Sequence, residues 1–165
     1  TFEPGDQRRV NWVDSFASAG VTFYYPYKYK LSSSNGSPTE YLMVLRLAEQ
    51  YLIRAEAEAN LGDSSDAIND LNLIRSRAGL ASYNSASNGP LLSAILHERR
   101  VELFMEWGHR WFDLQRTNLI NSVMGAPGNF CQQKGGIWNP YEALFPIPES
   151  EIQLNSKLTQ NLGYN

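Results

Sequence analysis

The sequence predicts a mainly α-helical protein with long irregular loops and one short β-hairpin. Three observations support this prediction. Apolar residues recur every three or four positions in segments 41–79 and 91–119, which is the spacing of amphipathic helices. Gly, Pro, Ser and Asn are mixed with aromatic residues before position 41, and charged residues become rare after position 116. With 165 residues and a hydrophobic content of 42%, the chain can bury one core, so we expect a single domain across 1–165.

Residues that favour β-strands are concentrated in two neighbouring stretches near the N-terminus. Residues 21–25 read Val-Thr-Phe-Tyr-Tyr, and residues 27–31 read Tyr-Lys-Tyr-Lys-Leu with partial alternation. Pro26 between them indicates an edge strand or a bend, because proline cannot donate a ladder hydrogen bond. The Ser- and Gly-rich segment 32–38 is a predicted loop. We therefore expect one short hairpin within an irregular region.

Segment 41–79 is predicted to form two antiparallel helices. Gly62 fits the C′ position of the first helix, and Gly79 ends the second. Ser64 or Ser65 fits the N-cap of the second helix. Because only a few residues connect them, the two helices form an αα-hairpin of tetratricopeptide-like type, and a single copy does not support a regular solenoid. The buried stripe of the first helix is expected to contain Val44, Leu47, Ala48, Tyr51, Leu52, Ala55 and Ala59.

Segment 91–119 is the densest part of the chain in both charge and aromatic mass. Pro90 fits the first helical position, and Gly108 predicts a break before a second helical turn. Charged side chains crowd beside tryptophans here, so they are expected to be partly desolvated, and desolvated charges must be paired. The remaining residues 144–164 are predicted to be extended chain with a short turn. The sequence therefore predicts a structural ion-pair network made of Glu98, Arg99, Arg100, Glu102, Glu106, His109, Arg110, Asp113 and Arg116.

The carboxylates of this segment could also be arranged for catalysis. Glu98 with Glu102, or Glu102 with Glu106, could mimic the acid–base pair of a glycosidase. Each lies close to an arginine, which lowers the pKa of a carboxyl, whereas a proton-transferring carboxyl needs a raised pKa. His109 has Glu102, Glu106 and Asp113 within reach on a helix, which could suggest a metal site. In both cases we favour the structural ion-pair interpretation.

Motifs for nucleophilic, nucleotide or redox chemistry are absent from the sequence. It contains no GxSxG, GxGxxG, GxxxxGK[ST] or HExxH. The single cysteine, Cys131, excludes an internal disulfide and a multi-cysteine metal site. We therefore expect no enzymatic activity, no cofactor and no metal.

The overall charge limits the classes of partner. A net charge of -3 and the lack of a basic block argue against nucleic acid or an anionic membrane as the main partner. These residues show no pattern of a signal peptide, lipidation signal or spanning segment, and this carries no conclusion about location. It begins with Thr1-Phe2 rather than an initiator Met, so we expect a fragment or a processed product.

Aromatic residues are numerous outside the helical stripes, with 4 Trp, 9 Tyr and 7 Phe in the chain. Exposed rings can stack on the apolar faces of sugars, while nearby polar side chains supply hydrogen bonds. The competing interpretation is that most of these rings fill gaps between irregular segments and helices. The glycan-binding candidates are Trp12, Tyr25, Trp138 and Tyr141.

Several runs of the sequence, in this order, resemble the C-terminal part of the SusD/RagB family of Bacteroidetes nutrient-binding lipoproteins. They are LRLAEQYL at 45–52, LNLIRSRAGL at 71–80, ILHERRVEL at 95–103, GHRWFDL at 108–114, FPIP at 145–148 and TQNLGY at 159–164. Together they extend over nearly the whole chain, which makes the resemblance specific.

The resemblance implies a tetratricopeptide-type helical scaffold without catalytic activity. It further implies a protein on the outer face of the outer membrane that captures oligosaccharides or polysaccharides, or in some members peptides, and passes them to a SusC-like TonB-dependent transporter. Family members extend further on the N-terminal side and begin with a lipid-modified cysteine, so membrane attachment would come from a lipid anchor in that missing half. Cys131 is not the lipid site. In this family the ERR and GHRWFDL runs look like scaffold rather than a ligand site.

Two other functions stay open from the sequence. A helical module that binds a peptide or a protein could use the groove of the αα-hairpin, although there are no further repeats to build an extended groove. A glycosidase rests only on carboxylate spacing and is the weaker of the two.

Overall fold

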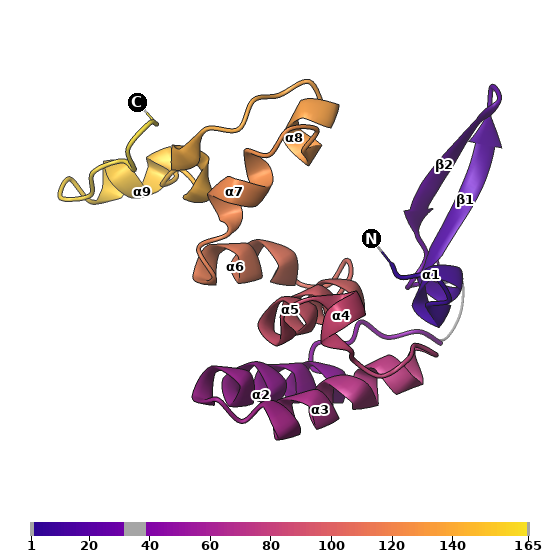
Figure 1. The fold of residues 1–165 in the computed structure, drawn as a ribbon. Coiled ribbons are helices and arrows are strands. Elements are labelled where there is room, and N and C mark those ends of the chain that lie inside the picture. Colours follow the sequence, from indigo (N-terminus) through magenta and orange to yellow (C-terminus); the bar gives the residue numbers. More distant parts are fainter. Residues whose placement is uncertain (1, 32–38, 165) are drawn as a thin grey trace. The chain divides into compact units, whose positions relative to one another are not determined.

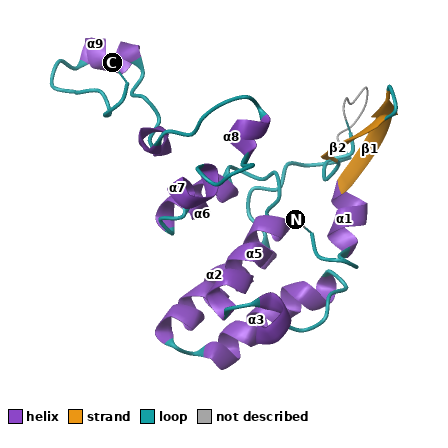
Figure 2. Cartoon of the chain, turned by 45° about the horizontal axis from the view of Figure 1, so that its top comes forward, coloured by secondary structure: helices purple, strands orange, loops and turns teal. Residues whose placement is uncertain are grey.

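The computed structural model describes residues 2–31 and 39–164 and confirms a mainly α-helical fold with one small sheet. The chain forms two compact units, residues 1–109 and 110–165, and each is described by itself. Figure 1 follows the elements in chain order, and Figure 2 shows how helices and loops predominate over strands. That the whole chain is one domain stays a prediction.

The first unit begins with a short helix that runs directly into a β-hairpin. Helix α1 (Gln7–Trp12) is followed by strand β1 (Val13–Ser18), which pairs antiparallel with β2 (Val21–Pro26). Ala19 and Gly20 connect the strands and have φ angles of 50° and 78°. Two consecutive positive φ values are typical of a two-residue turn whose twist matches that of the flanking strands.

The predicted hairpin is right in kind and wrong in position. The strand over residues 21–26 pairs with Val13–Ser18, and residues 27–31 form no strand. The reason is local, because Ala19 and Gly20 make a tight turn between Val13–Ser18 and residues 21–26, whereas Pro26 lacks the N–H needed to continue a ladder and ends its strand. The predicted loop 32–38 lies outside the described residues.

Two antiparallel helices, α2 (Leu47–Leu61) and α3 (Ser64–Arg77), form the predicted αα-hairpin. Gly62 ends α2 with a φ of 86°, and its N–H donates to the carbonyl of Ala59, as the C′ prediction requires. The N-cap of α3 is Asp63 rather than Ser64 or Ser65. Its carboxylate accepts from the N–H of Asp66, and a negative charge at a helix N-terminus is also favoured by the helix dipole.

Helix α2 begins later than the apolar spacing predicts. Residues 41–46 are not helical, and Val44, an expected member of the buried stripe, is 61% exposed. Leu47, the first residue of the helix, is also exposed. Helical spacing becomes a helix only where packing buries the apolar face, and in the first unit that burial starts at Ala48.

The core of the first unit lies where α2, α3 and α5 (Leu91–Glu102) meet. Leu52, Leu71 and Ile95, one from each helix, are fully buried. Ala55 and Ala67 are also fully buried, and small side chains there let the helices pack closely.

A break separates α5 from α6 (His109–Arg116), and it is longer than the single glycine predicted. The backbone leaves the helix after Glu102 and returns at His109. Within this break Met105 and Trp107 have φ angles of 59° and 42°, and Gly108 has a φ of 72°. Pro90 is the N-cap of α5, one position before the predicted one.

The second unit contains most of α6 and four further short helices, α7 (Ile120–Met124), α8 (Phe130–Gln133), η1 (Pro140–Ala143) and α9 (Glu149–Leu154). Helix α9 contradicts the prediction that residues 144–164 are extended apart from a short turn. Pro148 precedes it and two glutamates occupy its first turn, and both features favour a helix start. In the part of the chain that is described, no helix is both long enough and apolar enough to cross a membrane.

Candidate functional site

Three carboxylates at the C-terminal end of α5 and just beyond it form a buried polar group in the first unit. Glu98 and Glu102 have no exposed surface, and Glu106 is 7% exposed. They meet five cationic side chains from other segments, and together these eight residues are called the buried charge cluster. Its cations are Arg8, Lys28, Arg46, Arg75 and Arg77.

Arginine forks connect the carboxylates of the cluster. Arg8 Nη1 lies 2.5 Å from Glu98 Oε1 and 3.1 Å from Glu102 Oε2. Arg46 donates from Nη1 to Glu102 Oε1 at 2.6 Å and from Nε to Glu106 Oε2 at 2.9 Å. Such charge-assisted, multidentate contacts are the strong ones in proteins, and they compensate the desolvation of the buried charges.

The two fully buried carboxyls of the cluster have pKa values shifted in opposite directions. Burial raises the pKa of Glu102, but hydrogen bonds from Arg77 and Arg46 outweigh burial and leave it below its ordinary value. Burial also raises the pKa of Glu98, and there the charge of Arg8 offsets only part of the effect. Glu102 is therefore held as a carboxylate by its arginines.

The sequence predicts local partners for Glu98, Glu102 and Glu106 within segment 91–119. Their partners are distant in sequence, as with Arg8 and Glu102, which are 94 positions apart. Sequence reasoning missed Arg46 and the other four cations of the cluster. Only an indirect signal for these cations is present in the sequence. Buried glutamates require cationic partners, so cations from other segments could have been expected near them.

The other predicted members of the network lie outside this cluster. Arg99 is buried and Arg100 is exposed. His109 Nδ1 lies 3.6 Å from Glu49 Oε1. In the second unit Asp113 pairs with Arg116 at 2.8 Å, and Arg110 is half-buried. Among the described residues, no three His, Cys, Asp or Glu side chains are arranged to hold a metal ion.

One face of the β-hairpin carries a row of exposed aromatic rings. Phe16 and Phe23 are direct cross-strand partners and stack with centroids 5.4 Å apart and planes 20° apart. The Tyr25 ring lies 6.2 Å from Phe16, and its hydroxyl donates to Asp14 Oδ2 at 3.0 Å. The exposed fractions are 55% for Phe16, 47% for Phe23 and 37% for Tyr25. Phe16, Phe23 and Tyr25 are called the hairpin aromatic face, and Tyr25 was the only glycan-binding candidate predicted on it.

Trp12, the second predicted candidate of the first unit, is less available. It is half-buried, and the ammonium of Lys28 lies 3.9 Å from the centroid of its ring. A cation over the face of an indole occupies the surface on which a sugar would stack.

The two candidates of the second unit, Trp138 and Tyr141, contact other aromatic rings. Trp138 is half-buried, meets Trp111 edge-on at 6.1 Å and donates from its indole N–H to Asn121 Oδ1 at 3.0 Å. Tyr141 is 38% exposed and meets Tyr164 edge-on at 5.2 Å. Each therefore contributes to packing within its unit, and the four predicted candidates are distributed between two units.

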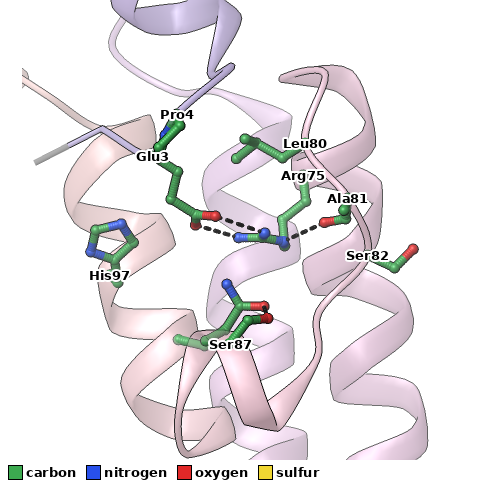
Figure 3. A pocket seen from close by; sticks show the side chains of 10 residues that line it. Glu3, Pro4, Arg75, Leu80, Ala81, Ser82, Ser87 and His97 are labelled. Atoms are coloured by element: carbon green, nitrogen blue, oxygen red, sulfur yellow. Dashed lines mark hydrogen bonds and ion pairs between the residues drawn. The ribbon is translucent and has the colours of Figure 1, made fainter.

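A pocket of about 480 Å³, lined by both polar and apolar residues, opens between α3, α4 (Ser85–Asn88), α5 and the N-terminal segment. Arg75 donates to both Glu3 oxygens, at 2.7 and 3.0 Å, and to the carbonyl of Ala81 at 2.9 Å. Figure 3 shows this Glu3–Arg75 pair with the imidazole of His97 on one side and Ser82 on the other. The hollow is called the Arg75 pocket. Its lining residues are Glu3, Pro4, Arg75, Leu80, Ala81, Ser82, Ser87, Asn88, Ala94 and His97.

Comparison with known proteins agrees with the sequence resemblance and with the fold. In structure, the chain is similar to a SusD superfamily protein from Bacteroides vulgatus, with a TM-score of 0.74 and 31% identity, covering 99% of this chain and 37% of that one. In sequence, residues 13–164 match the family model described as the SusD family. The chain belongs to the SusD/RagB family.

Named relatives cover most of this chain but extend well beyond it. SusD-like protein P2 of Formosa agariphila is 37% identical over 153 residues, which is 86% of this chain and 29% of that protein. The starch-binding protein SusD of Bacteroides thetaiotaomicron is 29% identical over 152 residues, which is 83% of this chain and 25% of that protein. The chain therefore spans about a quarter to a third of the length of the curated relatives that it matches.

Proposed function

We propose that this chain is part of a non-catalytic cell-surface protein that binds glycans and delivers them to a TonB-dependent outer-membrane transporter. Membership of the SusD/RagB family supports nutrient binding, and one of the relatives is a starch-binding protein. Attachment to the outer membrane through a lipid anchor and pairing with a SusC-like transporter belong to the same proposal. These two features would involve parts of a protein longer than this chain, because the relatives are about three to four times as long.

The burial of the carboxylates supports binding rather than hydrolysis. A general acid must reach the glycosidic oxygen directly or through one water. Glu98 and Glu102 have no exposed surface, and arginines occupy their oxygens. We infer that these carboxylates, together with Glu106, stabilise the fold.

The hairpin aromatic face is the observation that carries the glycan proposal. Stacked Phe16 and Phe23 with the neighbouring Tyr25 present a continuous apolar platform in solvent, and a sugar ring has an apolar face that suits such a platform. The Asp14 carboxylate beside the Tyr25 hydroxyl can accept hydrogen bonds from sugar hydroxyls. Exposed apolar patches often mark interaction sites, so a binding role accounts for this arrangement.

Native affinity electrophoresis against plant, host and microbial polysaccharides tests this proposal, and starch belongs in the panel because the Bacteroides thetaiotaomicron relative binds it. We expect retardation by one class of polysaccharide, which Phe16→Ala and Tyr25→Ala abolish. Tyr24→Ala is the matched control, because Tyr24 is 64% exposed and points to the opposite face of the same strand. An equal loss of retardation with Tyr24→Ala would contradict the role of this face. So would retardation that survives Phe16→Ala and Tyr25→Ala but is abolished by Trp138→Ala.

A second candidate, binding of a peptide or protein, is favoured by one observation in the first unit. The residues just before α2 expose a run of apolar side chains, with Val44 61% and Leu45 75% exposed. Pull-down of a peptide that survives Phe16→Ala and fails with Leu45→Ser would favour this candidate over glycan binding.

A further inference from the structure

The Arg75 pocket has the size and construction of a small-molecule site. Its volume of about 480 Å³ lies within the range of ligand pockets. Its walls come from α3 and α5 of the helical core, from the loop at 80–82, from α4 and from the N-terminal segment. Because α3 and α5 pack on a common core, their side of the pocket has a fixed shape, which favours specific binding.

The floor of the pocket contains one arginine, and two carboxylates pair with it. Arg75 is 4% exposed, and its guanidinium pairs with Glu3 through both oxygens and with Glu98 Oε2 at 3.3 Å. An anionic ligand needs an uncompensated cation, and here two carboxylates already compensate the arginine. The floor therefore disfavours anions and leaves a neutral polar ligand.

Polar groups around the pocket have unused hydrogen-bonding capacity. Among the described residues, neither the imidazole of His97 nor the hydroxyl of Ser82 makes a hydrogen bond. The amide of Asn88 uses only its oxygen, which accepts from Asn84 N at 3.0 Å, so its N–H donors are available. Each oxygen of Glu3 accepts one bond from Arg75 and can accept another.

We propose that the Arg75 pocket binds a neutral pyranose ring, held by Glu3, Ser82, Asn88 and His97. Vicinal hydroxyls each donate and accept, which suits a set of mixed donors and acceptors at fixed positions, and Leu80 and Ala94 supply apolar contact for the ring carbons. This inference rests on the proposed glycan-binding function and adds a second subsite, apart from the hairpin aromatic face.

Titration with neutral methyl hexopyranosides, followed by the imidazole NMR signals, tests the proposal in the intact chain. The chain has two histidines, so His109 serves as an internal control for His97, and a His97→Gln spectrum assigns the signals. We expect a saturable shift of the His97 signals with the glycoside of one hexose and none at His109. Sodium glucuronate, an anion, is expected to bind at least tenfold more weakly.

Two substitutions give a matched comparison of affinity. Asn88→Ala removes the free amide donors and is expected to weaken binding about tenfold, the effect of one good hydrogen bond. Ser82→Ala, in a loop where the side chain makes no hydrogen bond, is expected to weaken it a few-fold without affecting folding. Ser93→Ala, an exposed position on α5 outside the pocket, is expected to leave affinity unchanged.

The outcomes separate this proposal from the proposed function. The pocket proposal would be overturned by the lack of a saturable shift at His97, by an equal shift at His109, or by tighter binding of glucuronate. This holds even if polysaccharides still retard the chain in electrophoresis through the hairpin aromatic face. Saturable hexoside binding that Ser82→Ala weakens would support the pocket, even if no polysaccharide retards the chain in electrophoresis.

Discussion

Replacement of Glu102 by glutamine tests whether the buried charge cluster holds the first unit together. Glutamine keeps the size of the side chain and removes the charge that Arg8, Arg46 and Arg77 share. Arg8 is 5% exposed, so it loses one of its carboxylate partners in a place that water barely reaches. Breaking a buried ion pair costs about 3–5 kcal/mol. Because small domains are stable by only about 5–15 kcal/mol, we expect a large loss in the free energy of unfolding.

The two compact units need not unfold together, so the assay must report on the first unit alone. Native-state hydrogen exchange at the amide of Ile95, at the centre of that core, does so, and urea unfolding by circular dichroism supports it. Glu58→Gln is the matched control, because Glu58 is paired only at 3.7 Å with Arg54, whose side chain is 60% exposed, and such a pair contributes little. An exchange rate at Ile95 in Glu102→Gln equal to that of the wild type would refute the reasoning.

The stability difference between wild type and Glu102→Gln should depend on pH in a definite direction. The pKa of Glu102 lies below its ordinary value near 4.5 because its arginines outweigh burial. The stability that the carboxylate contributes is therefore fully present above pH 4.5 and is lost as the pH falls through the lower folded-state pKa. The gap between wild type and Glu102→Gln should shrink in that acidic range, and the double variant Arg46→Gln/Glu102→Gln should lose less than the sum of the two single losses.

Three further predictions follow from burial and backbone geometry. Burial lowers the pKa of His97 below its ordinary value of 6.5, so wild-type stability should fall more steeply than that of His97→Gln as the pH drops below 6.5; parallel thermal melts of both proteins across pH would check this. Leu71→Ala should destabilise the first unit by about 2–5 kcal/mol in urea unfolding, whereas Leu73→Ala, at a 52% exposed position on the same helix, should not. Gly163→Ala should loosen the C-terminal loop, because Gly163 has a φ of 94° and a Cβ there would collide with the ring of Tyr141. Limited proteolysis of this loop should become faster, and an unchanged rate of proteolysis would contradict the prediction.

Local signals explain which helices could be predicted. Gly62 and Gly79 both have positive φ values and end their helices where the sequence predicted. These signals act within a few residues, so they can be recognised without the rest of the fold. The start of α2 could not be predicted in the same way, since residues 41–46 continue the apolar spacing but are not buried.

The candidate sites were less predictable than the helices. Tyr25 was a candidate, but its companion Phe16 becomes apparent only when the register pairs Phe16 with Phe23. The Arg75 pocket could not be predicted at all, because four segments separated along the chain supply its walls and His97 alone gives no sign of them.

The sequence by itself determined that Glu98, Glu102 and Glu106 would have to be paired, because carboxylates on a helix rich in apolar residues cannot be buried alone. Only the tertiary structure decided which cations pair with them. Arg8 reaches Glu102 across 94 positions and Arg46 reaches it across 56, and these distances along the chain become contacts only when the helices pack. Charge pairing depends on proximity in space, and the spacing of residues along one helix cannot determine proximity between segments.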